Sequence, residues 1–179
     1  YMEHLPYIDR VWIGEGRDYN TPPDYWLIEI SGIPFGVMGE MLQGGGNPWR
    51  GMVYGMTSRL PYMADPRPIW KVWDEFGMQG SRMIGYWVPN CPVRTDHPSV
   101  LATVYRKPGK ALVAIASWAR EKMNCHLTID FAKLGLDAAH ARLHALEVPG
   151  FQPPATFGPS DAIPVESGRG WMLMIEKTK

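Results

Sequence analysis

The sequence predicts two structural parts, an incomplete parallel α/β unit followed by a small antiparallel β-sandwich. Strand-like and helix-like segments alternate in the first half, with polar, glycine-containing loops between them. Short segments with alternating apolar residues and turn signals fill the second half. Of the 21 aromatic residues, 15 lie in the first 90 positions. We therefore expect an α/β part over residues 1–88, a linker over 89–98 and a β-sandwich domain over 99–179.

The first half begins with a predicted strand at residues 8–13, followed by a polar loop at 14–20. Thr21 is placed to cap a helix, because two prolines follow it and Gly32 can end the helix. Residues 25–30 are also rich in aromatic and β-branched side chains, which leaves a strand as the alternative. The helix is the favoured interpretation.

A second strand is predicted in the short apolar run at residues 33–38, before a loop with three glycines at 44–46. The Asn47-Pro48 dipeptide begins another turn or helix. A further helix is expected from Asp65 to Gly77, because prolines mark its entry and apolar residues recur at helical spacing.

The second half contains at least five predicted strands. Residues 100–105 and 111–118 form a hairpin around the turn at 107–110. The other predicted strands are residues 125–131, 141–148 and 171–175.

Charge and composition exclude several classes of protein. The chain has 179 residues with 18 Lys+Arg and 18 Asp+Glu, and this balance argues against nucleic-acid wrapping or a polybasic membrane anchor. No run approaches the roughly 20 apolar residues of a membrane span. The chain starts without Met and without a signal peptide, so we expect a soluble piece of a longer polypeptide. It would be periplasmic or secreted if the parent chain carries a signal peptide.

Neither a metal nor a cofactor is expected. Cys91 and Cys125 are interpreted as free, buried thiols. His140 and His144 are four residues apart but lack a third ligand nearby. No nucleophile elbow, phosphate-binding loop or dinucleotide fingerprint occurs.

Polar side chains follow the two predicted strands of the first half. The first loop carries Glu15, Arg17 and Asp18, and the second carries Glu40. In parallel α/β proteins reactive groups sit at the carboxyl ends of strands, and most glycosidases use a pair of carboxylates. Glu15 is the first candidate for a catalytic acid or base, with Arg17, Asp18 and Glu40 as substrate-binding candidates. The alternative is structural, since loop carboxylates often cap helices or pair with arginines.

Aromatic residues flank the same loops. Flat apolar rings beside hydrogen-bonding groups suit the faces and hydroxyl edges of sugars. Trp49, in a loop rich in glycine and proline, is the aromatic candidate for substrate binding. Trp70, Trp73 and Phe76 recur at helical spacing and are interpreted as core residues.

Several segments resemble the last part of large bacterial proteins similar to glycoside hydrolase family 123. They are residues 7–16 (YIDRVWIGEG), 25–36 (YWLIEISGIPFG), 39–42 (GEML), 47–55 (NPWRGMVYG) and, in the second half, 110–118 (KALVAIASW). The resemblance implies the end of a (β/α)8 catalytic barrel followed by an antiparallel β domain. It also implies a carbohydrate substrate and contact with the rest of the parent polypeptide.

Family 123 enzymes act on β-linked N-acetylgalactosamine, whose acetamido group attacks the anomeric carbon with help from an adjacent Asp-Glu pair. The only such pair here, Asp74-Glu75, lies inside a predicted helix and is interpreted as a solvated face. The resemblance therefore places the main catalytic carboxylates upstream of residue 1, and we expect the isolated chain to be inactive. The alternatives are a non-catalytic carbohydrate-binding module and a structural module.

Overall fold

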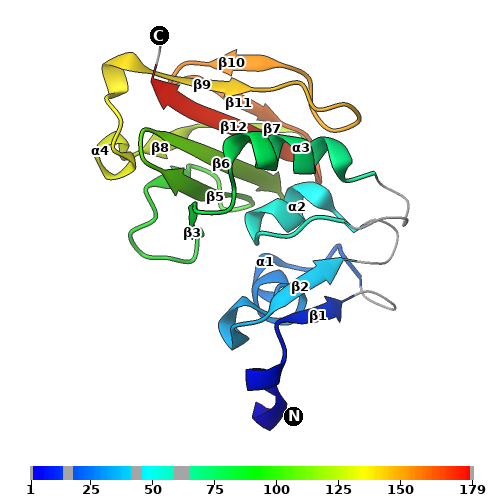
Figure 1. The fold of residues 1–179 in the computed structure, drawn as a ribbon. Coiled ribbons are helices and arrows are strands. Elements are labelled where there is room, and N and C mark those ends of the chain that lie inside the picture. Colours follow the sequence, from blue (N-terminus) through cyan, green and yellow to red (C-terminus); the bar gives the residue numbers. More distant parts are fainter. Residues whose placement is uncertain (1, 14–17, 42–45, 59–64, 178–179) are drawn as a thin grey trace.

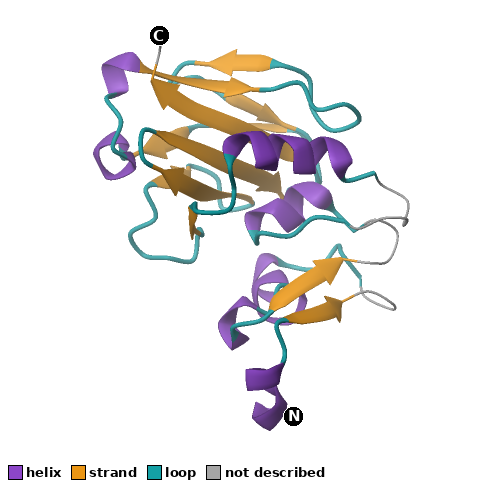
Figure 2. Ribbon diagram, in the orientation of Figure 1, coloured by secondary structure: helices purple, strands orange, loops and turns teal. Residues whose placement is uncertain are grey.

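The structure is a computed structural model that describes residues 2–13, 18–41, 46–58 and 65–177. A pair of short parallel strands and its helices lie beside a larger antiparallel part (Figure 1). Figure 2 shows that α2 (Pro48–Val53) lies between the parallel pair and the large sheet. Helix α3 (Arg67–Phe76) lies along the face of that sheet.

The parallel unit is a strand, a helical crossover and a second strand. After a 3₁₀ helix, η1 (Met2–Tyr7), the chain forms β1 (Arg10–Ile13), α1 (Pro23–Tyr25) and the π-helical continuation η2 (Trp26–Ile30). The second 3₁₀ helix η3 (Ile33–Phe35) then leads into β2 (Met38–Met41). β1 and β2 pair in parallel, with Trp12 opposite Glu40. The predicted parallel α/β arrangement is confirmed for these two strands.

The helix after the first loop is confirmed, and the alternative strand at residues 25–30 is wrong. Its cap differs from the prediction. Pro22 occupies the N-cap position, and no side chain caps the helix there. Thr21 lies one residue further out, where its carbonyl accepts a hydrogen bond from the Trp118 indole at 3.0 Å.

The second strand begins later than the sequence predicts. Residues 33–35 form η3 instead of a strand, because Gly32 and Gly36 on either side adopt positive φ angles of 69° and 73° and close a tight turn. The strand starts at Met38. As a result, Glu40 lies inside β2, whereas the sequence placed it in the loop that follows a strand.

The two later helices are confirmed. α2 is capped by Asn47, whose Oδ1 accepts a hydrogen bond from the Arg50 backbone N–H at 3.0 Å. α3 ends at Gly77, which has the left-handed conformation typical of helix C-termini.

The antiparallel part is built on one six-stranded sheet of order β10-β9-β12-β6-β5-β3. Two short two-stranded sheets, β11-β7 and β4-β8, accompany it. The strands are β3 (Arg82–Ile84), β4 (Val93–Thr95), β5 (Val100–Lys107), β6 (Lys110–Ser117), β7 (Met123–Cys125), β8 (Leu127–Ile129), β9 (Ala141–Ala145), β10 (Ala155–Phe157), β11 (Ile163–Val165) and β12 (Gly170–Lys177). The predicted antiparallel β architecture is confirmed, as one large sheet with two small ones.

The predicted strand at residues 125–131 is wrong in its extent. The structure divides it into the last residue of β7, which pairs with β11, and the whole of β8, which pairs with β4. The division occurs at His126, whose backbone N–H donates to the Asp96 carboxylate at 2.8 Å. Asp130 then caps the short helix α4 (Phe131–Leu134), and the 3₁₀ helix η5 (Ala138–His140) follows.

Both faces of the large sheet are buried. One face packs against the small sheets and α4, in a cluster that includes Val104, Ile115 and Leu173. The other face packs against α2 and α3 through Met52 and Phe76. Helix α3 and strand β3 therefore belong structurally with the antiparallel part, because β3 pairs with β5.

A third apolar cluster joins the parallel unit to this sheet. Trp26 and Ile30 of η2 pack with Met41 of β2, Tyr54 and Ala116 of β6. The two parts of the chain therefore share a core.

Cys91 and Cys125 are buried free thiols, as the sequence predicts. Burial raises the pKa of both, to about 11 for Cys125. In the described part of the chain, no helix is long and apolar enough to cross a membrane.

We expect Gly39→Ala to destabilise the protein by at least about 2 kcal/mol, because the added Cβ would lie 1.9 Å from the Ile30 carbonyl oxygen. The free energy of unfolding in urea measures this effect. Gly36→Ala is the matched control. It meets no atom within 4 Å and carries only the strain of its positive φ, about 1 kcal/mol. Equal losses in the two variants would contradict the close packing of β2 on η2.

Candidate functional site

Four side chains share one face of the β1–β2 pair. Arg10 lies opposite Met38 and Trp12 lies opposite Glu40, and residues two apart in a strand point to the same side. Met41 points to the other side, where it packs in the core beneath η2 and α2. The shared face is open, since Trp12 is 63% exposed and Met38 is 50% exposed.

Glu40 lies at a cavity of about 210 Å³. Its side chain is 17% exposed, and its Oε2 lies 3.7 Å from Arg10 Nη1. Trp70 and Trp73 of α3 also line the cavity, together with Thr57. The Trp70 indole donates a hydrogen bond to Thr57 Oγ1 at 2.8 Å.

The cavity combines hydrogen-bonding groups with flat apolar surface. The Trp73 indole N–H has no hydrogen-bond partner among the described residues. A carboxylate, a guanidinium and indole rings in one hollow can bind a ligand that carries hydroxyl groups and apolar C–H faces.

A second charged group, Arg50 of α2, is buried at 7% exposure. Its Nη1 donates to the Tyr19 carbonyl oxygen at 2.8 Å, and its Nε donates to the Ser117 carbonyl oxygen at 3.2 Å. The guanidinium also lies 5.0 Å from the centre of the Trp118 ring. Burial lowers the pKa of Arg50, and the nearby Tyr54 and Asp18 partly oppose this shift.

Two family models match the chain. Residues 1–61 match the TIM-barrel domain of glycoside hydrolase 123, and residues 65–176 match the C-terminal domain of glycoside hydrolase 123. The chain belongs to glycoside hydrolase family 123. The resemblance seen in the sequence is confirmed, and membership of family 123 implies a carbohydrate substrate. A search of curated proteins found no match.

In this family 123 chain, the residues predicted for the site fall in different places. Glu15 and Arg17 lie outside the described residues. Asp18 is exposed, and its Oδ1 accepts a hydrogen bond from the Asn20 backbone N–H at 2.8 Å, as expected for a turn residue. Glu40 lies on the open strand face beside Arg10.

Trp49 contacts the C-terminal domain. Its ring lies 5.0 Å from the Phe151 ring, and the Arg169 guanidinium lies 5.4 Å from its centre. The side chain is half-buried between two core clusters. These contacts distinguish it from Trp12, the more exposed indole.

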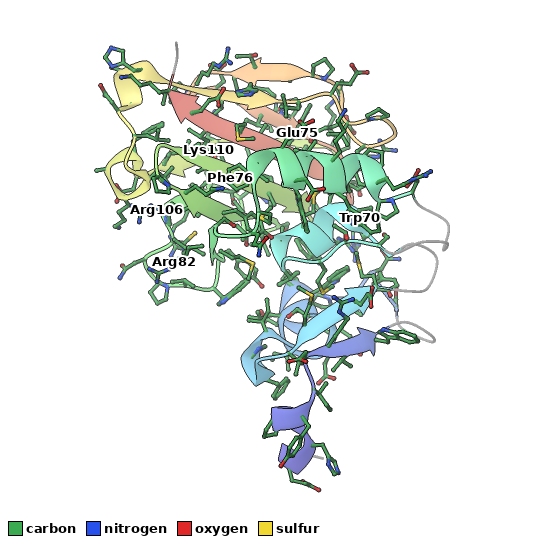
Figure 3. All side chains as sticks on the ribbon, in the orientation of Figure 1. Trp70, Glu75, Phe76, Arg82, Arg106 and Lys110 are labelled. Carbon is green, nitrogen blue, oxygen red and sulfur yellow. The ribbon has the colours of Figure 1, made fainter. Side chains whose placement is uncertain are left out.

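The Asp74-Glu75 pair occupies the exposed side of α3, as the sequence predicts. Both residues are exposed, and Glu75 pairs with Lys71 at 3.9 Å on the same helix. Figure 3 shows Glu75 on α3, the helix that also carries Trp70.

Sequence reasoning missed the contribution of three residues to the cavity. Arg10 was not considered, although its position two residues before Trp12 in a predicted strand gives the two the same side. Trp70 and Trp73 were assigned to the core from their helical spacing. Trp73 does pack against the core, but both residues also line the cavity at Glu40.

No group of three metal-ligating side chains comes together within the described ranges. His140 Nδ1 instead lies 2.6 Å from Asp137 Oδ2, and His144 Nε2 lies 3.7 Å from Glu176 Oε1. Each histidine therefore has a carboxylate neighbour of its own.

We expect Arg10→Gln to change the free energy of unfolding by less than about 1 kcal/mol, because its pair with Glu40 is long and the Arg10 side chain is 57% exposed. Arg50→Gln should cost about 2–4 kcal/mol, because it leaves buried carbonyl oxygens without their charged donor. Chemical denaturation of the two variants measures the difference. A large loss for Arg10→Gln would show that the pair is structural.

Proposed function

We propose that this chain supplies part of the catalytic barrel of a glycoside hydrolase, together with its C-terminal accessory domain. The observation that carries the proposal is the match of residues 1–61 to the TIM-barrel domain of family 123. The parallel pairing of β1 and β2 across a helical crossover supports it. A further parallel bridge between Met41 and Ser58 extends the same pattern to a third segment.

We propose the strand face that bears Arg10, Trp12, Met38 and Glu40 as the inner face of this barrel. The helical layer of a (β/α)8 barrel lies outside its strands. Because η2 packs against the opposite face through Met41, this face is the one left for the interior. Reactive groups of such barrels lie at the carboxyl ends of the strands. Trp12 and Glu40 are nearer to these ends than Arg10 and Met38 are.

In the proposed roles, Glu15 is a general acid or base, or accepts a hydrogen bond from a sugar hydroxyl. It follows β1 by two residues in the sequence. Glu40, next to the Arg10 cation, accepts a hydrogen bond from a sugar hydroxyl, and Asp18 and Arg17 bind substrate. Trp49, half-buried beside the Phe151 ring, completes the proposed binding set.

For the division of the chain, we propose a domain boundary between residues 61 and 65, earlier than the expected boundary at residue 88. The two family models meet there. The packing of α3 on the large sheet and the pairing of β3 with β5 support this position.

The alternative, a carbohydrate-binding module in the antiparallel part, has less support. Such modules present exposed aromatic side chains to the sugar. Among the described residues, the exposed large apolar side chains all belong to the first 38 positions: Tyr7, Ile8, Trp12, Ile28, Phe35 and Met38.

The substrate implied by the family is a β-linked N-acetylgalactosaminide, and the chromogenic p-nitrophenyl glycoside tests the proposal in the polypeptide that carries this chain. Glu15→Gln should lower kcat by at least about 100-fold, the usual cost of losing a general acid or base. Glu40→Gln should mainly raise KM, because the carboxamide binds a hydroxyl more weakly than the carboxylate does.

Glu147→Gln, an exposed position on the C-terminal domain, is the control and should leave both constants unchanged. A Glu15→Gln variant with activity within about threefold of the wild type would exclude Glu15 from general acid-base catalysis. An unchanged KM in Glu40→Gln would exclude Glu40 from substrate binding.

A further inference from the structure

The segments that return from the carboxyl ends of β1 and β2 are tied to the C-terminal domain. Residues 18–21 precede α1 on the chain after β1, and residues 46–50 follow β2 and include the first turn of α2. Both segments reach the end of the large sheet where β6 finishes and β12 begins (Figure 1). Three hydrogen bonds join the segments to this end of the sheet, and a fourth, from the Arg50 guanidinium, joins the two segments to each other.

Arg50 is the centre of this connection. It donates to the Tyr19 carbonyl oxygen on one side and to the Ser117 carbonyl oxygen of β6 on the other. Trp118, which stacks beneath the guanidinium, donates its own indole N–H to the Thr21 carbonyl oxygen at 3.0 Å. The segment from 18 to 21 is thus held at two carbonyl oxygens by neighbouring side chains.

Asn47 makes the matching connection for the second segment. Its Nδ2 donates to the Gly168 carbonyl oxygen at 2.8 Å, while its Oδ1 caps α2. One amide group therefore fixes the start of α2 against the turn that precedes β12. This contact joins residues 121 positions apart in the sequence.

The chemistry of Arg50 argues against a purely stabilising role. A buried guanidinium loses hydration, and an apolar side chain of similar size often gives equal or greater stability at such a position. What the guanidinium adds is direction, because its N–H groups form a rigid planar fork. Here that fork fixes the Tyr19 backbone relative to the last residue of β6.

We infer that the C-terminal domain positions the substrate-binding side of the barrel, and that Arg50 is the positioning residue through which it does so. This inference rests on the proposed function, since Asp18 and Glu40 gain their roles from it. Arg50 acts on Asp18 through the backbone of the adjacent Tyr19, whose carbonyl oxygen it binds at 2.8 Å. The accessory domain is accordingly part of the catalytic unit.

A spin label tests the positioning on the 179-residue chain itself, without any assay of activity. Asn20→Cys provides an exposed attachment site in the first segment, and Thr156→Cys on β10 provides a matched site in the sheet. The native cysteines are buried and have raised pKa values, so they react slowly with the labelling reagent.

The test variants are Arg50→Lys, which keeps the charge but loses the fork, and Trp118→Phe, which keeps a ring but loses the indole N–H. In both, the label at position 20 should become more mobile while the label at position 156 keeps its spectrum. An unchanged label at position 20, or an equal change at both positions, would overturn the inference. Arg142→Gln, an exposed residue of β9, is the control for a general effect of losing an arginine.

Kinetics in the polypeptide that carries this chain form the second arm. Arg50→Lys should raise KM by at least about threefold with a smaller change in kcat, because the group it positions, Asp18, binds substrate in the proposed function. Arg142→Gln should leave both constants unchanged. Equal activity of Arg50→Lys and wild type would overturn the positioning role. An inactive wild type with the expected label result would instead contradict the proposed function and leave the mechanical link between the two parts established.

Discussion

The indole of Trp26 is the contact on which the two parts of this chain depend. It is fully buried, and its centroid lies 5.9 Å from the ring of Tyr54 and 6.3 Å from the ring of Trp118. These partners come from the end of α2 and the end of β6, so one side chain joins three elements. An aromatic side chain of this size buries roughly 150–250 Å² and dominates the energetics of the surface it occupies. Burial of the ring stabilises the contact between the two parts. The hydrogen bonds of Arg50, Trp118 and Asn47 set the orientation of one part relative to the other.

Local signals in the sequence predicted much of the fold. The prolines at the N-cap and in the first turn of α1 and α3, and the glycine after α3, have their usual meaning at helix ends. The hairpin of β5 and β6 follows from two apolar runs on either side of a Pro-Gly turn, with Gly109 at a positive φ of 73°. In each case residues close together in the chain decide the structure.

The predictions from sequence were wrong where the local structure depends on glycine conformation or on residues distant in the chain. η3 replaced a predicted strand because two glycines could adopt left-handed conformations that composition alone does not reveal. The strand at 125–131 divided because Asp96, some thirty residues earlier, binds the backbone at His126. The cavity at Glu40 was predictable only in part, since the pairing of Trp12 with Glu40 depends on register and the approach of Trp70 depends on tertiary packing. Three-residue strands such as β4 and β11 are too short to show any periodicity.

At the end of the large sheet where β6 finishes and β12 begins, the hydrogen bonds between the two parts have main-chain carbonyl oxygens as acceptors, those of Thr21, Ser117 and Gly168. The donors, by contrast, are particular side chains. A main-chain acceptor remains after almost any substitution that preserves the local backbone, whereas a donor is lost when its residue changes. The junction is therefore unequally sensitive to substitution on its two sides. A change at Thr21 or Ser117 that preserves the local backbone keeps the acceptor, whereas a change at Asn47, Arg50 or Trp118 removes a donor. Gly168 is the exception among the acceptors, because its positive φ of 65° favours glycine.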